Sequence, residues 1–344
     1  MKPRTYGCLL GLLLFVLAVS IIVNVLQFSA GAVGGSSLTM GASSRPPLRE
    51  RLEVPAESGA ERGKIVKIDL DGVISSVAPE GLFGVAVSTV AGLRRQFEQA
   101  ANDDDIKAVV LRVNSPGGEV TASDILHHEL KKLAEKKPVV VYMDSIAASG
   151  GYYIACASQH IVASETTLTA SIGVIIDTVN YADLFGKVGL ASNTFVSGPF
   201  KDSLSGSRPM REDERAYVQG LVDQMYDRFL TVVSEGRKLG KTQLRNGVAD
   251  GRVVTGRQAL ELGLVDQIGY IEDAYAKARE LGGAEGAGVV TYRSATSFFE
   301  ILAESSATGL KAEPIKVEVK GPWPAAMLQP GVPYYLSPLS VPGH

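Results

Sequence analysis

The sequence predicts an α/β protein in which buried strands alternate with helices along one folded domain. Short runs of apolar and β-branched residues indicate strands at residues 65–70, 107–113 and 138–143. Between them, apolar positions recur at helical spacing over residues 90–101 and 121–137. Because a helix separates each strand from the next, we expect neighbouring parallel strands.

The N-terminal segment predicts a membrane anchor over residues 1–30. Lys2 and Arg4 precede an uncharged apolar run of 21 residues from Cys8 to Phe28, and at ~1.5 Å per residue such a helix spans the ~30 Å hydrocarbon core. Positive charge on the N-terminal side places the remainder of the chain across the cell membrane, as a single-pass protein with an extracytoplasmic domain. A cleaved signal peptide is the alternative, because Ala30-Gly31-Ala32 resembles a cleavage site.

The rest of the chain divides into three parts. Residues 31–63 are rich in Gly, Ser, Pro and charge, which is typical of a flexible linker. The folded domain is expected over residues 64–281, with a long amphipathic helix from Arg211 to Leu239. Residues 282–344 form a Gly-rich and Pro-rich C-terminal extension to which the sequence assigns no role.

Composition excludes several classes of function. The 34 basic and 37 acidic residues give a net charge of −3, so no basic excess suggests nucleic-acid binding. The two cysteines, Cys8 and Cys156, lie in different kinds of segment. They indicate neither a disulfide framework nor a cysteine-based metal site.

A serine stands where a strand gives way to a helix. Ser149 follows the third apolar run and precedes Gly150, Gly151 and a small apolar segment. A hydroxyl at such a turn lies at the open end of the sheet, beside the free N–H groups that begin a helix and can stabilise an oxyanion. Serine is also a favoured helix N-cap, so this turn needs a chemical partner before catalysis can be inferred.

A second glycine turn follows the preceding strand, in the segment from Asn114 to Gly118. Neighbouring parallel strands would bring both turns to the same end of the sheet, where they could flank one carbonyl group. The oxyanion donors would then be the backbone N–H of Gly150 and that of Gly117 or Gly118. Gly118 is preferred, although the sequence does not decide between the two.

The two glycine turns together resemble the ClpP/crotonase superfamily. The resemblance rests on Asn114-Ser-Pro-Gly-Gly118 and Ala147-Ala-Ser149-Gly-Gly-Tyr-Tyr153, and it is closest to the signal peptide peptidase A family of membrane-anchored serine proteases. It implies stacked strand-strand-helix units. ClpP-type relatives use a histidine after the serine, but the corresponding segment here begins at Ser171 and contains none. The chain's histidines, His127, His128, His160 and His344, lack an evident orienting carboxylate.

The signal peptide peptidase A family uses a serine–lysine dyad instead, and the segment from Ser197 to Asp202 resembles its lysine motif. The resemblance therefore implies that Ser149 is the nucleophile and that Lys201, 52 residues later, is the general base. Ser171 corresponds to a family serine that orients the lysine. The lysine must be neutral to accept the serine proton. Taken alone, Lys201 would be interpreted as a solvated loop residue paired with Asp202.

The resemblance implies a serine endopeptidase that cleaves remnant signal peptides or other membrane-associated peptides. It also implies a ring-shaped homo-oligomer and no metal or nucleotide cofactor. Two alternatives stay open. A crotonase-type acyl-thioester enzyme would use the same pair of N–H groups without Ser149, and a non-catalytic membrane scaffold would need neither Ser149 nor Lys201.

Overall fold

The computed structural model describes residues 47–60, 63–77, 88–293 and 334–336, together with Leu17 and Ser20, which are helical. Apart from these two residues, the predicted anchor from Cys8 to Phe28 lies outside the described residues, as does the start of the predicted linker. Among the described residues, no helix has both the length and the apolar character needed to cross a bilayer.

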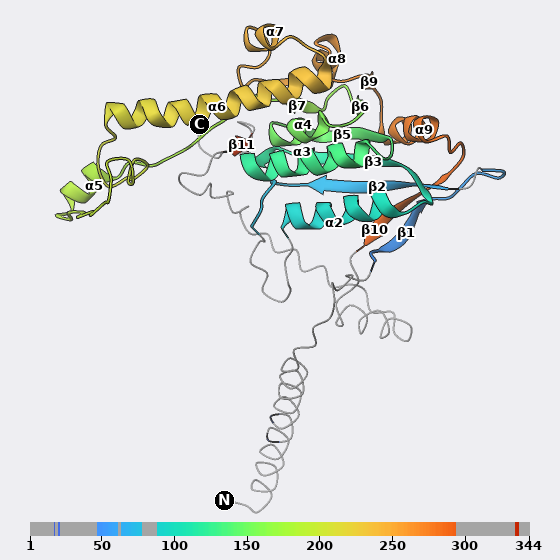
Figure 1. The fold of residues 1–344 in the computed structure, drawn as a ribbon, viewed down its shortest axis with the longest axis horizontal. Coiled ribbons are helices and arrows are strands. Elements are labelled where there is room, and N and C mark those ends of the chain that lie inside the picture. The colour runs from blue at the N-terminus through green and yellow to red at the C-terminus, as the bar shows by residue number, and fades with distance from the viewer. Residues whose placement is uncertain are drawn as a thin grey trace, which may run out of the picture. The chain divides into compact units, whose positions relative to one another are not determined.

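A mixed sheet forms the centre of the described fold (Figure 1). Its main path runs β1-β10-β2-β3-β5-β6-β9, while β7 and β8 extend from the end of β5. All the neighbouring pairs are parallel except β1 with β10 and β7 with β8. The strands are β1 Arg49–Val54, β2 Lys64–Asp71, β3 Ile106–Ser115, β5 Val139–Ala148, β6 His160–Ala163, β7 Leu168–Ala170, β8 Val253–Thr255, β9 Gln267–Ile268 and β10 Gly288–Arg293. A separate pair joins β4 Gly117–Glu119 to β11 Tyr334–Leu336.

Helices cover both faces of the sheet. The helices are α2 Thr89–Asn102, α3 Val120–Ala134, α4 Gly150–Ala155, α5 Ala182–Lys187, α6 Glu212–Arg237, α7 Lys241–Arg245, α8 Gly256–Glu261 and α9 Ile271–Gly282. One core contains buried residues of α2, α3, α4 and α6, and a second core lies between α9 and the opposite face. Because both faces are covered, β3 is a nearly continuous apolar run rather than an alternating one.

The structure confirms the predicted α/β order and extends some of its elements. The strands expected at 65–70, 107–113 and 138–143 correspond to β2, β3 and β5. β5 continues five residues beyond Met143, to Ala148, because Ile146–Ala148 pairs with β7. This extension carries the sheet directly to Ser149. The first glycine turn contains a strand of its own, β4, which the sequence did not predict.

The sheet also includes strands from outside the predicted domain of residues 64–281. β1 comes from the segment expected to be a linker, and β10 comes from the C-terminal extension. β10 lies between β1 and β2 and pairs with both, so all three strands belong to one sheet. The compact unit accordingly begins at Leu48.

The long helix α6 is buried over only part of its length. Phe229 and Val233, in its second half, are fully buried against the core, whereas Tyr217 in its first half is 49% exposed. In Figure 1 this first half projects beyond the sheet together with α5. The predicted apolar face therefore packs in the second half and stays largely open in the first. We call the segment before α6 that projects with it, residues 175–211, the arm.

Candidate active site

Ser149 occupies a strained turn between β5 and α4. Its backbone has φ 53° and ψ −113°, a region that side chains other than glycine rarely adopt. Such a residue costs about 1–3 kcal/mol and persists only where its surroundings hold it. The side chain is fully buried, and its Oγ has no hydrogen-bond partner among the described residues. It therefore does not cap α4, although serine commonly has that role.

The adjacent strand end holds this turn in place. Ala148 pairs with Ala170 in the parallel β5–β7 ladder, and the N–H of Ser149 donates to the Ala170 carbonyl at 2.7 Å. Ala170 and Ser171 also have positive φ, at 63° and 51°, and the N–H of Ser171 donates to the carbonyl of Arg252 at 2.9 Å. The structure thus places Ser171, predicted to orient the lysine, at the strand end next to Ser149.

The two glycine turns meet, as the sequence predicted. A Cβ built on Gly117 would lie 2.8 Å from the nitrogen of Gly150, and one built on Gly150 would lie 3.2 Å from the nitrogen of Gly118. The N–H of Gly117 already donates to Ser115 Oγ at 3.2 Å. This contact favours Gly118, rather than Gly117, as the partner of Gly150 in stabilising an oxyanion.

Gly150→Ala is expected to lower kcat/KM by about 100-fold or more, the size of effect seen when one oxyanion donor is lost. The added methyl group would lie 2.4 Å from Ser123 Oγ and 3.3 Å from Gly117 Cα, so the two turns would move apart. Steady-state kinetics measure the effect. Ser123→Ala serves as the control, because it removes the Ser123 hydroxyl, which lies nearest the added methyl group, without adding a group to the Gly150 turn. Wild-type kinetics for Gly150→Ala would contradict the assignment.

No described histidine is placed to act as the base. His127 is 7% exposed and packs edge-on against the Tyr153 ring, with the centroids 5.2 Å apart. Burial lowers the pKa of His127 to about 4, so its imidazole is neutral at physiological pH. His160 contacts Gln267 through Nε2. Since Ser149 Oγ has no partner among the described residues, no imidazole there hydrogen-bonds to it.

Lys201 lies in the arm, and among the described residues no hydrogen bond joins its amine to Ser149 Oγ. The residue is exposed at a groove with apolar walls that include Leu204 and Leu221, and no ion pair involves it within the described ranges. The ring of Phe200 packs on Tyr217, with the centroids 5.2 Å apart. At ~1.5 Å per residue, Tyr217 lies roughly 18 Å along α6 from Phe229, whose ring contacts α4.

β11 lies against the glycine turn and was not predicted from the sequence. It pairs antiparallel with β4, so that Tyr335 is opposite Gly118. The Tyr335 carbonyl oxygen would be 2.0 Å from a Cβ on Gly117, an approach that only glycine permits. The Tyr335 side chain is fully buried beside Tyr153 and Phe229. The edge of β4 beside the Ser149 turn is therefore paired with an extended segment of the chain itself.

A buried serine on a strained strand-to-helix turn, with two glycine N–H groups and an edge that pairs with an extended chain, has the geometry of a serine-type hydrolase acting on peptides. Comparison with known families supports this class. The model of the Clp protease family matches residues 87–168, and that of peptidase family S49 matches residues 131–285.

Relatives from bacteria and a plant extend the match. An Enterococcus faecium protein named as a signal peptide peptidase SppA is 38% identical over 251 residues, which are 73% of this chain and 73% of the relative. Protease 4 of Salmonella typhi is 39% identical over 67% of this chain and 36% of its own length. The chloroplastic serine protease SPPA of Arabidopsis thaliana is 35% identical over 64% of this chain and 32% of its own length.

The chain belongs to peptidase family S49, the SppA/Protease 4 family, and is a serine-type peptidase. This assignment favours the peptidase interpretation over the acyl-thioester enzyme and the non-catalytic scaffold. The α/β sheet with its covering helices fits the ClpP-like fold of the family.

Proposed function

We propose that this chain is a membrane-anchored serine endopeptidase that cleaves remnant signal peptides or other membrane-associated peptides. Ser149 is the nucleophile, Lys201 the general base and Ser171 the residue that orients the lysine. One observation carries the proposal: Ser149 is held in a strained turn, with its Oγ unpartnered among the described residues, beside the backbone nitrogens of Gly150 and Gly118.

The chemistry follows from these positions. The neutral amine of Lys201 accepts the proton of Ser149 Oγ while the oxygen attacks the peptide carbonyl. The N–H groups of Gly150 and Gly118 stabilise the negative charge that develops on the carbonyl oxygen. The lysine then returns the proton to the leaving amine, which leaves an acyl-enzyme. Water attacks this ester by the same route, releases the second product and restores the serine. No metal or nucleotide takes part in the proposed scheme.

We assign the base at each nucleophile to a neighbouring copy of the chain. Lys201 is carried on the arm, and Ser149 Oγ has no hydrogen-bond partner in the described part of its own chain. The arm exposes large apolar side chains that a second copy would cover: Val179, Tyr181, Leu184, Val188, Leu190, Phe195 and Val196. Repeating one such head-to-tail contact closes a ring when the rotation between neighbours divides a full turn. The ring-shaped homo-oligomer that the family resemblance implies would thus complete each active site.

The membrane location rests on the sequence. The apolar run from Cys8 to Phe28 is long enough to span a bilayer, and Lys2 and Arg4 favour a cytoplasmic N-terminus. The folded domain would then lie on the extracytoplasmic side, near the remnant signal peptides left in the membrane. An N-terminal anchor on every copy would also align the ring with the bilayer surface.

Complementation between two inactive variants tests the proposal. Ser149→Ala keeps Lys201, and Lys201→Ala keeps Ser149, so a mixed ring contains sites with both groups. If the copies assemble at random and equally, about one quarter of the sites are complete, since each site draws one residue from each of two neighbours. Co-expressed variants, purified through two different tags, should therefore regain about a quarter of wild-type peptidase activity.

The control is the double variant Ser149→Ala/Lys201→Ala co-expressed with either single variant. It should stay inactive, because one of the two groups is then missing from every site. If the mixed single variants also stay inactive although the doubly tagged complex forms, the dyad does not join two copies. Activity in either single variant alone would instead reject its residue as part of the dyad.

A further inference from the structure

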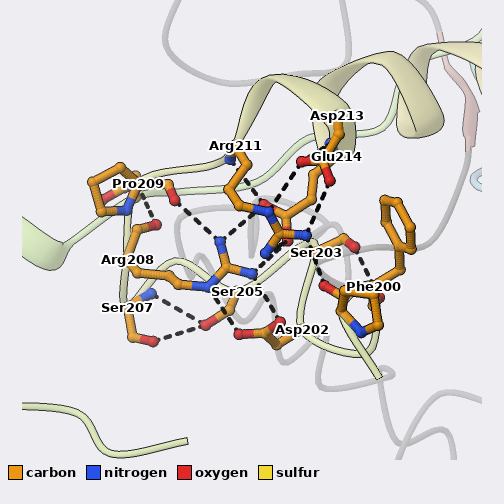
Figure 2. Close-up of polar contacts among 12 residues, drawn as sticks. Phe200, Asp202, Ser203, Ser205, Ser207, Arg208, Pro209, Arg211, Asp213 and Glu214 are labelled. Atoms are coloured by element: carbon orange, nitrogen blue, oxygen red, sulfur yellow. Dashed lines mark hydrogen bonds and ion pairs between the residues drawn. The ribbon is translucent and has the colours of Figure 1, made fainter. Parts of the chain in front are cut away.

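The loop that carries Lys201 is fixed on both sides of the lysine (Figure 2). On one side, Arg211 donates to the Pro199 carbonyl at 2.8 Å, and its guanidinium lies 5.9 Å from the centroid of the Phe200 ring. On the other side, Arg208 donates to both carboxylate oxygens of Asp202, through Nε at 2.9 Å and Nη2 at 2.8 Å. The residues before and after Lys201 are therefore both held by arginines.

Both arginines converge on one buried carboxylate. Glu214, in the first turn of α6, has a fully buried side chain and accepts from Arg208 Nη1 at 2.8 Å. It also pairs with Arg211 Nη1 at 2.9 Å and accepts from the Arg211 backbone N–H at 2.8 Å. The hydrogen bonds from Arg208 lower the pKa of Glu214 to about 2, so the carboxylate is ionised. Glu214 thus ties the loop to the start of α6.

Asp202 is paired with Arg208 rather than with its neighbour Lys201. Its side chain is 16% exposed, and the hydrogen bonds from Arg208 hold its pKa below the usual value. The sequence alone suggested an ion pair between Lys201 and Asp202, but no such pair is present among the described residues. This partner choice matters because an anion beside a lysine favours the protonated amine, which cannot act as a base.

We propose that Arg208 is a positioning residue for the general base. Arg208 neutralises Asp202 and fixes the loop, so that the amine of Lys201 is free to take the serine proton. This inference rests on the proposed role of Lys201 and adds a requirement to it. The requirement is the ion pair between Arg208 and Asp202, neither of which needs to touch the substrate. Arg208 acts through Asp202 and Glu214.

The charged groups around Lys201 limit what can produce a pH effect. Within the groove lined by Lys201, α6 contributes one titratable side chain, Tyr217. Asp202 follows Lys201 in the loop but does not line the groove. The remaining charges of the cluster are Arg208, Arg211, Asp213 and Glu214. Arg211 forms its ion pairs with Glu214 and Asp213 independently of Arg208. Removing the charge of Arg208 therefore leaves the carboxylate of Asp202, the residue next to Lys201, without the cation that hydrogen-bonds to it.

Arg208→Gln should move the rising limb of the pH profile of kcat/KM to higher pH by about one unit, the low end of the shift that a nearby opposite charge produces. On that limb, kcat/KM at a fixed pH should fall about tenfold, since one pH unit is a tenfold change in the neutral amine. The shift is to higher pH because the unpaired Asp202 carboxylate stabilises the ammonium form of Lys201. The double variant Arg208→Gln/Asp202→Asn removes both charges, so its midpoint should return to that of the wild type.

The double variant separates electrostatics from structure. If Arg208 only stabilises the loop, both variants lose activity at every pH and neither midpoint moves, and the inference is overturned. A shifted midpoint that Asp202→Asn does not restore also overturns it. Arg257→Gln is the matched control and should leave the profile unchanged, because it breaks only the exposed pair between Arg257 on α8 and Glu165 in the turn after β6. Activity in Lys201→Ala would instead defeat the proposed dyad, which is a different outcome.

Discussion

Ser149→Ala is expected to lower kcat/KM for peptide hydrolysis by more than about a thousandfold, the scale of loss known when a nucleophile is removed. The hydroxyl forms the bond to the substrate carbonyl in the proposed mechanism, and no described side chain hydrogen-bonds to its Oγ. Alanine adopts the same backbone as serine, so the strained turn at φ 53° and the pairing of β5 with β7 should persist. The melting temperature should therefore change little.

Labelling with a serine-directed phosphonate gives a second readout of the same residue. The wild-type protein should carry the label on Ser149, located by mass spectrometry of the digested chain, and Ser149→Ala should carry none. Ser171→Ala is the matched control, since Ser171 is also a nearly buried serine at a strand end with positive φ. It should be labelled at Ser149, although more slowly if it orients the lysine. Residual hydrolysis above about one thousandth of wild type in Ser149→Ala would exclude Ser149 as the nucleophile.

Lys201→Arg is expected to be as inactive as Lys201→Ala. Arginine keeps the positive charge but does not lose its proton near neutral pH, so it cannot act as a general base. The exposed position of Lys201 in the arm can accommodate the longer side chain without disturbing a core. If the residue served only to attract or pair an anion, arginine would replace it. The comparison therefore separates a base from a charge.

The pH dependence of the wild type completes this test. Its kcat/KM should rise with pH along a single ionisation, because only the neutral amine accepts the serine proton. Chelating agents should have no effect in the proposed mechanism. An active Lys201→Arg variant, or a wild-type profile reproduced by Lys201→Ala, would assign the base to another group.

Much of the fold could be predicted because the sequence patterns are local. The runs that became β2, β3 and β5 are apolar enough to be buried on both faces, and the helical spacing at residues 90–101 corresponds to α2. The position of β10 could not be predicted in this way, because its place between β1 and β2 depends on pairing over more than 200 residues of chain. Long-range pairing leaves no local signal.

In the candidate site, too, the locally encoded features could be predicted and the long-range contacts could not. The turns at Gly118 and Ser149 carry local glycine signatures, and parallel strands bring them together. Taken alone, the adjacent charges of Lys201 and Asp202 suggest an ion pair, which was the alternative to the dyad, whereas the structure places Arg208, six residues after Asp202, on that carboxylate. The apolar triplet Tyr334-Tyr335-Leu336 was the only local sign of β11 in the Pro-rich tail, and it gives no indication of pairing with β4.

The insertion of β10 between β1 and β2 sets a lower limit on any recombinant fragment of this enzyme. Trimming to residues 64–281 would remove both β1 and β10 and leave the backbone N–H and C=O groups along one side of β2 without partners. An unpaired, apolar edge of this kind is a template for association with other chains. Such a fragment would contain Ser149 and Lys201 yet tend to precipitate. Shortened versions intended for crystallisation or screening therefore need to begin before Arg49 and to end after Arg293.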